Sequence, residues 1–202
     1  MTGDSGYGRA SKYLHSRSKR CLDIVVSLLL LLPAIVVMAC AGLLILVREG
    51  RPILFLQDRV GKNGELFRMP KLRTLRTDAD PYVPPAGHDL SSHVTATGGP
   101  LRRHHLDELP QLFTVLAGRM SLVGPRPELP GVVATYSPFQ RTRLLMKPGL
   151  TGLWQVMADH NVPIHRDLKY DLYYLRKASL WLDVRLLILT IPFVVSPRRN
   201  GL

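Results

Sequence analysis

The chain of 202 residues carries a formal net charge of +12 and has a sequence pI of about 10.2. This length allows one compact domain, or a membrane segment followed by a compact domain, and we favour the second. The charge indicates an anionic partner such as a nucleic acid, a membrane surface or a phosphorylated substrate. The two cysteines lie in or beside an apolar run, which excludes a disulfide-rich fold, and no Cys and His spacing is typical of a zinc site.

The only long apolar run lies near the N-terminus, where residues 24–47 contain no charged side chain. A helix of this length could cross a bilayer. Pro33 removes a backbone donor and clashes with the preceding turn, which predicts a kink or break after Leu32. The part before the break would be about 14 Å long, close to half of a hydrocarbon core. These lengths fit a re-entrant helix-hairpin that bends at Pro33 and returns.

Basic residues flank the apolar run on both sides, with Lys19 and Arg20 before it and Arg48 and Arg51 after it. Basic flanks prefer the cytoplasm, so a hairpin keeps both flanks there, whereas a spanning helix leaves one outside. We therefore favour the re-entrant form, with a single spanning anchor as the alternative. A cleaved signal peptide fits worst, because the run is long and no small-residue cleavage site follows it.

This division predicts a basic N-terminal segment at 1–18, a membrane helix at 19–50 and a compact domain at 51–202. The elements expected in that domain are, in chain order, a hairpin or loop at 57–75, a long loop at 78–100, a helix at 109–116, a helix with a proline near its middle at 130–146, a glycine-bounded turn at 147–152, an amphipathic helix at 164–177 and an apolar segment at 180–195. The last segment is suited to the membrane interface, and a buried core helix is the equal alternative.

Two consecutive carboxylates, Asp107 and Glu108, precede Pro110 at the start of an expected helix. Neighbouring side chains on a helix diverge by about 100°, so the two need not share one task. One can bind a hard cation or attack phosphorus, while the other orients a metal or moves a proton. A solvated acidic helix face is the commoner role for such a pair, but a helix N-terminus favours the ionised form that a nucleophile or ligand requires.

Basic residues around these carboxylates could bind phosphate. Arg126 lies between Pro125 and Pro127, which fix the backbone and can aim a guanidinium fork at a diphosphate. Four further basic residues could complete an anion-binding cluster, namely Lys71, Arg73, Arg102 and Arg103. Each of these four is, by itself, more typical of contact with solvent or lipid headgroups.

Six segments follow one another in a recognisable order. They are Lys19-Arg20 with Asp23, residues 57–61, residues 71–74, residues 106–112, residues 121–127 and residues 148–156. This ordered set resembles the bacterial sugar transferases, the monotopic phosphoglycosyl transferases that act on polyprenol phosphate. The resemblance extends from about residue 19 to residue 190, and the chain resembles the minimal form without additional N-terminal spans.

The resemblance implies an α-rich α+β fold, with a re-entrant membrane helix-hairpin and a compact cytoplasmic catalytic domain bearing interfacial amphipathic helices. It implies transfer of a sugar 1-phosphate from a UDP-sugar to undecaprenyl phosphate, with Mg²⁺, at the cytoplasmic face of the inner membrane. Such a step begins exopolysaccharide, O-antigen or glycoprotein glycan synthesis. By similarity, Asp107 would be the nucleophile that forms a covalent phospho-sugar intermediate, and Glu108 its partner in metal binding or proton transfer. Lys71, Arg102 and Arg126 fall at phosphate-binding positions.

The chain departs from the family pattern at three places. Leu32 precedes the hairpin proline where serine is frequent, so a hydroxyl is missing at the expected bend. Arg119 stands where an acidic residue is usual. Residues 157–160 replace a turn that carries a basic residue near the substrate, which leaves recognition of the sugar or nucleotide open.

A non-enzymatic basic peripheral membrane protein that binds anionic lipid is the alternative, and it predicts that Asp107→Asn leaves every activity intact. Nucleic-acid binding rests on charge alone, because no binding motif is present. The expected partners are therefore a UDP-sugar, undecaprenyl phosphate and membrane lipids, and no nucleic acid. The sequence leaves a homodimer open, and it names neither the sugar nor the glycan.

Overall fold

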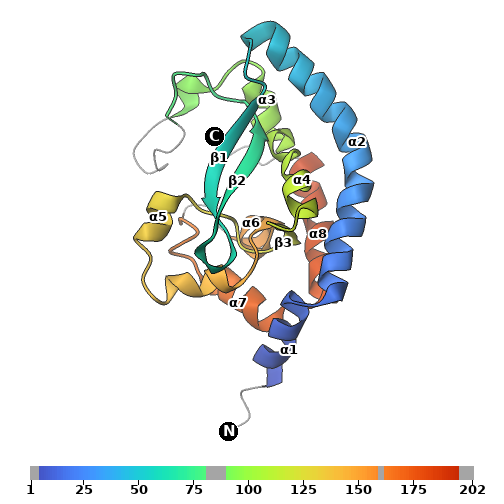
Figure 1. The fold of residues 1–202 in the computed structure, drawn as a ribbon, viewed down its shortest axis with the longest axis vertical. Coiled ribbons are helices and arrows are strands. Elements are labelled where there is room, and N and C mark those ends of the chain that lie inside the picture. Colours follow the sequence, from blue (N-terminus) through green and yellow to red (C-terminus); the bar gives the residue numbers. More distant parts are fainter. Residues whose placement is uncertain (1–4, 81–89, 159–161, 196–202) are drawn as a thin grey trace.

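A computed structural model describes residues 5–80, 90–158 and 162–195. The fold is rich in helices, with two small sheets and one long apolar helix near the N-terminus (Figure 1). This architecture agrees with the predicted α-rich α+β class. Part of the loop predicted at 78–100 lies outside the described residues, as do Asp159 and His160 of the departure at 157–160.

The long helix α2 (Arg17–Glu49) follows the short helix α1 (Ser5–Leu14). It has 33 residues and runs through Pro33 without interruption, so the structure contains no break after Leu32. The helix instead curves along its length (Figure 1). A proline removes a single hydrogen bond of the helix, and the turns on either side keep theirs. Among the described residues, α2 is the one helix long and apolar enough to cross a membrane, judged by length and composition.

One face of α2 packs against the rest of the chain at both ends and also at Ala34 in the middle, whereas the other face is exposed. Ser27 near the start and Ile45 near the end are fully buried. Between them, the side chains of Leu29 and Leu32 are 69% and 77% exposed. An exposed apolar surface of this kind requires an apolar surrounding, which is consistent with membrane association.

A β-hairpin lies beside the C-terminal part of α2. Strands β1 (Leu54–Val60) and β2 (Leu66–Leu72) pair antiparallel through the short 3-10 helix η1 (Lys62–Gly64). Alternate side chains of β2, such as Phe67 and Met69, enter the core. The hairpin predicted within 57–75 is therefore confirmed.

The centre of the domain is formed by α4 (Gln111–Leu116) and two short parallel strands, β3 (Ser121–Val123) and β4 (Gly149–Thr151). The predicted helix at 109–116 is confirmed, while the predicted turn at 147–152 contains a strand. These elements and their neighbours bury Leu112, Val115, Met120, Leu122 and Leu186.

The remaining elements surround this centre. They are η2 (Leu90–His93), α3 (Gly98–Arg103), η3 (Leu106–Glu108), α5 (Pro130–Ala134), η4 (Gln140–Leu145), α6 (Leu153–Met157), α7 (Lys169–Lys177) and α8 (Leu180–Val195). The single helix predicted at 130–146 is wrong, because α5 and η4 are separate. Pro138 between them lacks the amide proton that a continuous helix would need. The helix predicted at 164–177 begins only at Lys169.

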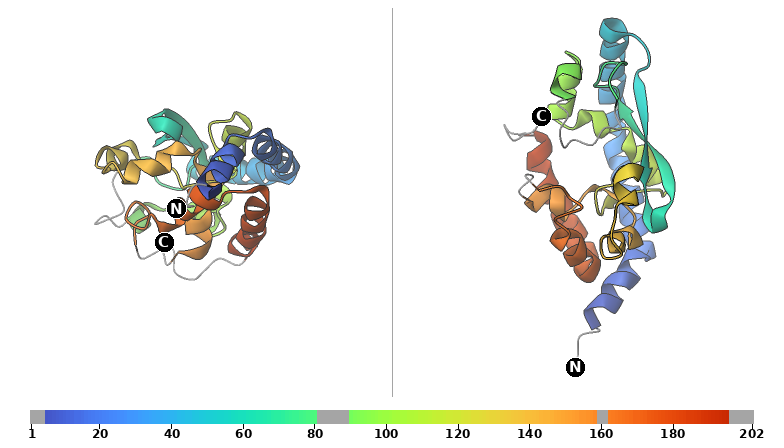
Figure 2. Two further views of the ribbon diagram at one scale, coloured as in Figure 1. Left: turned by 90° about the horizontal axis from the view of Figure 1, so that it is seen from below. Right: turned by 90° about the vertical axis from the view of Figure 1, so that its left-hand side faces the viewer.

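Helix α8 has features of both structures predicted for residues 180–195, a segment at the membrane interface and a buried core helix. Asp183 and Leu186 are buried, while Trp181 is 80% exposed and Ile191 is 59% exposed. One face therefore belongs to the core and the other is open to solvent or lipid. In Figure 2, α8 and the β-hairpin lie on opposite sides of the molecule.

Candidate active site

The two predicted carboxylates lie on η3, immediately after a sharp turn of the chain. His105 adopts φ 53°, in the left-handed region that residues other than glycine seldom occupy. This turn ends the passage from α3 and directs the chain into η3. Helix α4 follows at once, with Pro110 as its N-cap residue. Asp107 and Glu108 are thus held between two helices rather than on a freely moving loop.

Glu108 is the point at which two predicted phosphate-binding residues meet. Its Oε1 atom lies 2.9 Å from Lys71 Nζ and 3.0 Å from Arg126 Nη2. Lys71 comes from the end of β2, and Arg126 from the loop after β3. The side chains of Lys71 and Glu108 are only 15% and 12% exposed, so water screens this part of the group weakly.

Asp107 lies next to this group but has no hydrogen-bonded partner for its side chain among the described residues. It is 8% exposed. The charges of Lys71, Arg102 and His105 act on its carboxyl group, together with that of Glu108. The structure therefore brings five of the candidate residues, Asp107, Glu108, Lys71, Arg102 and Arg126, into one charged site.

The two carboxyl groups differ in their tendency to ionise. Burial raises the pKa of Asp107 and the charge of Glu108 raises it further, against the opposing effect of Lys71 and Arg102. Burial also opposes ionisation of Glu108, but the charges of Arg126 and Lys71 outweigh it and hold the pKa of Glu108 well below its usual range. Glu108 thus ionises more readily than a free carboxyl group, whereas Asp107 ionises less readily and has no hydrogen-bonded partner among the described residues.

Close backbone packing fixes the loop that carries Arg126. A Cβ atom on Gly124 would come within 2.4 Å of the Lys147 carbonyl oxygen, and one on Gly149 within 2.1 Å of the Gly124 nitrogen. Only glycine allows this approach between the ends of β3 and β4. Arg126 itself is 37% exposed in its side chain, so its guanidinium reaches from a fixed backbone toward the open side of the site.

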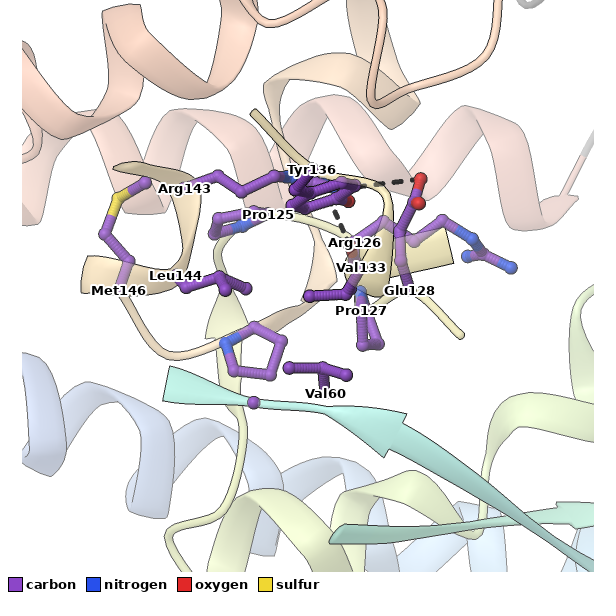
Figure 3. A pocket seen from close by; sticks show the side chains of 12 residues that line it. Val60, Pro125, Arg126, Pro127, Glu128, Val133, Tyr136, Arg143, Leu144 and Met146 are labelled. Carbon is purple, nitrogen blue, oxygen red and sulfur yellow. Dashed lines mark hydrogen bonds and ion pairs between the residues drawn. The ribbon is translucent and has the colours of Figure 1, made fainter. Parts of the chain in front are cut away.

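A buried arginine supports the same loop from behind (Figure 3). Arg143, only 3% exposed, donates from Nη2 to the Arg126 carbonyl oxygen at 3.0 Å. Its Nε donates to Asp171 at 2.8 Å and its Nη1 to the Tyr136 hydroxyl at 2.7 Å. Glu128 Oε1 lies 3.5 Å from Nη1. The sequence analysis did not find Arg143, because no motif surrounds it and its carboxylate partner is 28 residues away.

Arg73 does not join the charged site. It is buried, and its Nη2 donates to the carbonyl oxygens of Glu49 and Gly50 at 2.8 and 2.9 Å. These carbonyls belong to the C-terminal end of α2, where helices leave acceptors without partners and attract cations. The described contacts of Arg73 therefore fasten α2 to the hairpin.

The residues of the charged site could bind Mg²⁺ in one way only, through two carboxylates. No group of three or more His, Cys, Asp or Glu side chains in the described ranges could hold a metal by itself. Mg²⁺ is, however, commonly bound through one or two carboxylates with water and substrate phosphates completing its shell. Asp107, which lacks a hydrogen-bonded partner, and Glu108, whose Oε2 takes part in neither ion pair, can supply that smaller set.

Comparison with known proteins decides the family. The family model described as "Bacterial sugar transferase" matches residues 14–197. The chain belongs to the bacterial sugar transferase family. The resemblance predicted from the six ordered segments is therefore confirmed.

Several curated proteins are similar to this chain. The "Galactosyl transferase CpsE" of Streptococcus agalactiae is 35% identical over 201 residues, covering 91% of this chain and 43% of the relative. The "Undecaprenyl-phosphate galactose phosphotransferase" of Salmonella typhimurium is 34% identical over 208 residues, covering 96% and 42%. The "Exopolysaccharide production protein ExoY" of Sinorhizobium fredii is 31% identical over 196 residues, covering 90% and 87%.

The transferase thus spans less than half the length of the relatives from Streptococcus and Salmonella, and most of the length of ExoY. The matched portion contains every residue of the charged site.

Proposed function

We propose that this transferase moves a sugar 1-phosphate from a UDP-sugar to undecaprenyl phosphate through a covalent intermediate on Asp107. The observation that carries the proposal is a buried carboxylate without a hydrogen-bonded partner, placed among cations that can bind phosphate. The name of the Salmonella relative, an undecaprenyl-phosphate galactose phosphotransferase, supports undecaprenyl phosphate as acceptor and a sugar phosphate as the transferred group.

In the first step, an oxygen of Asp107 attacks the β-phosphorus of the UDP-sugar. A bond forms between that oxygen and phosphorus, the bond from phosphorus to the bridging oxygen breaks, and UMP leaves with the electron pair. Burial favours this attack, because a weakly solvated carboxylate loses little solvation when it reacts. Arg126 and Arg102 would offset the charge of the phosphoryl oxygens.

In the second step, an oxygen of undecaprenyl phosphate attacks the same phosphorus. The acyl phosphate bond breaks, Asp107 returns as a carboxylate, and the lipid leaves as a diphosphate-linked sugar. Glu108 keeps Lys71 and Arg126 in place during both steps, because its two ion pairs fix their charged ends. Mg²⁺, held by Asp107 and Glu108 with substrate phosphates, would supply positive charge to the phosphoryl oxygens.

We further propose that α2 is re-entrant, so that the domain lies on the cytoplasmic face of the inner membrane. Arg20, before the apolar run, donates to the Val115 and Leu116 carbonyl oxygens at 2.7 and 2.5 Å. After the run, Arg73 binds the carbonyl oxygens at the end of the same helix. A straight span would separate its two ends by about 30 Å of hydrocarbon. Both ends of this curved, unbroken helix contact one domain, which supports entry and exit on the same face of the membrane (Figure 1).

The reaction is tested by incubating the purified full chain with a panel of UDP-sugars, undecaprenyl phosphate and Mg²⁺, and measuring UMP. We expect UMP with at least one sugar, only when the donor is present, and no UMP from Asp107→Asn. Equal UMP release by Asp107→Asn protein would remove the mechanism. A wild-type chain that releases no UMP but binds anionic vesicles would instead favour a lipid-binding protein without activity.

The topology is tested with single cysteines in a chain whose Cys21 and Cys40 are replaced by alanine. Ser18→Cys lies before the apolar run and Arg51→Cys after it, and both positions are exposed. We expect a membrane-impermeant maleimide to label both from the cytoplasmic side of inverted vesicles. Labelling of the two positions from opposite sides would show a spanning helix.

A further inference from the structure

A second site lies at the tip of the β-hairpin, away from the charged active site. A pocket of about 120 Å³ opens between η1, the start of β2, the loop after α4 and the segment before β4. This volume is several times what a single water molecule requires. Leu66 lines the pocket and Lys71 lies five residues further along β2, a separation of roughly 16 Å in an extended strand. The pocket is therefore distinct from the catalytic centre.

The charged side chains that line this pocket are mostly cations, and these form no ion pair with a carboxylate in the described part of the chain. The cations are Lys62, Arg119 and Lys147, and the single carboxylate is Glu65. Lys62 contacts the ring of His15, with 2.6 Å between Nζ and Nε2. Among the described residues, the side chains of Arg119 and Lys147 have no hydrogen bond or ion pair. Three cations thus converge on one cavity with a single negative charge among them.

A fourth cation is fixed behind the pocket. Gly118 adopts φ +79°, and a Cβ atom at this residue would lie 3.7 Å from both Arg20 Nη2 and Lys147 Nζ. The guanidinium of Arg20 cannot move away, because it donates to two carbonyl oxygens of α4. Burial lowers the pKa of Lys147, and the charge of Arg20 lowers it further. The Arg20 charge thus opposes protonation of Lys147, and an anion bound in the pocket would relieve this repulsion.

We propose that Lys62, Arg119 and Lys147 form a binding site for a phosphoryl group, independent of the proposed reaction. The position of the site favours the headgroup of an anionic phospholipid as the source of that group. Arg20 lies four residues before the apolar run that begins at Ile24, so the pocket is near the level at which this helix would enter the membrane. Leu66, at the edge of the pocket, is 60% exposed and offers an apolar contact beside the cations. A phospholipid combines the same two features.

The experiment uses the full chain in micelles of dodecyl maltoside, which is uncharged. Three probes are titrated, namely dihexanoyl phosphatidylglycerol, dihexanoyl phosphatidylcholine and inorganic phosphate, and the dissociation constant is taken from the rise in Tm. The variants are Arg119→Glu and Lys147→Gln, with Arg176→Glu as the matched control. Arg176 is exposed on α7 and does not line the pocket.

We expect saturable stabilisation of the wild-type chain by phosphatidylglycerol and weaker binding of phosphatidylcholine, whose choline group repels the cations. Arg119→Glu and Lys147→Gln should each weaken binding about tenfold or more, because hydrogen bonds to charged groups are lost. Arg176→Glu should weaken it by less than about threefold. Equal binding of inorganic phosphate, with the same dependence on Arg119, would confirm the phosphoryl site and assign it to a soluble anion. The absence of saturable stabilisation by any probe, or an equal loss in Arg176→Glu, would overturn the site.

Discussion

Two groups of buried charges in this molecule use the same kinds of residue for different ends. At the junction of α1, α2 and α8, Asp183 is completely buried and accepts hydrogen bonds from Lys19, Tyr13 and Tyr174 at 2.6 to 2.7 Å. At the candidate active site, Glu108 is paired in a similar way, but the neighbouring Asp107 has no hydrogen-bonded partner in the part of the chain that the structure describes. The comparison shows that a carboxylate with every oxygen bound stabilises a fold, whereas one left beside cations is available to react.

The largest expected effect on stability tests the first group. Asp183→Ala would leave Lys19 buried without its counter-ion, which should lower the free energy of unfolding by about 3 to 5 kcal/mol. Urea unfolding in detergent micelles measures the loss. Asp78→Ala is the matched control, because the pair of Asp78 with Arg76 is more than half exposed and should contribute little to stability. A similar small loss in both variants would remove the distinction.

Arg126→Ala tests the phosphate-binding half of the active site. If the guanidinium contacts the transferred phosphoryl group, kcat/KM should fall by about 2 to 4 kcal/mol of transition-state stabilisation. The Tm should change little, because the Arg126 side chain is partly exposed. Arg176→Ala, on the surface of α7, should retain its rate of UMP release. A normal rate in Arg126→Ala would show that this arginine is not used.

Arg143→Lys tests whether the buried network acts through Arg126. Lysine keeps the charge but cannot bind Asp171, Tyr136 and the Arg126 carbonyl together, so we expect kcat to fall about tenfold, or about 1.4 kcal/mol. The same change in an Arg126→Ala background should cost little more, because the side chain that it positions is gone. Fully additive losses in the double variant would show that Arg143 acts on stability alone.

The pH dependence of the first step gives the smallest expected effect, and the direction of each shift is clearly predicted. Attack requires the ionised form of Asp107. The rate at which the UDP-sugar forms the phospho-sugar adduct on Asp107 should therefore increase with pH, through a pKa above the ordinary value of about 3.9. Lys71→Met removes a cation that lowers this pKa, and the acidic limb should move to higher pH. Glu108→Gln removes an anion that raises it, and the limb should move to lower pH. Shifts in the same direction for both variants would contradict the assignment.

The sequence indicated the residues that meet in the charged site more readily than the contacts that support them. Asp107, Glu108 and Arg126 lie in short contiguous segments whose local chemistry is readable without coordinates. Arg143 supports Arg126 from another part of the chain, and no local pattern indicates such a contact. Lys71 and Arg73 are two residues apart and would share a face of an extended strand. The strand ends at Leu72, and the free carbonyls of α2 attract Arg73 instead.

Prolines limited the fold prediction in opposite ways. Pro138 separates α5 from η4, although the apolar spacing around it indicated one helix. Pro33 indicated a break, yet α2 continues through it. The local cost of a proline is similar in both places, and the surroundings decide the outcome. α2 is held at both ends by packing and hydrogen bonds, whereas the segment around Pro138 is short and exposed.

The central claim is that Asp107 carries the phospho-sugar between donor and acceptor. The most direct measurement is the intact mass of the full chain after rapid mixing with the UDP-sugar that supports UMP release, in the absence of undecaprenyl phosphate. We predict a mass increase equal to one sugar phosphate, located at Asp107, absent from Asp107→Asn and lost when the lipid is added. A wild-type chain that turns over without this adduct, or an adduct that persists in Asp107→Asn, would contradict the account.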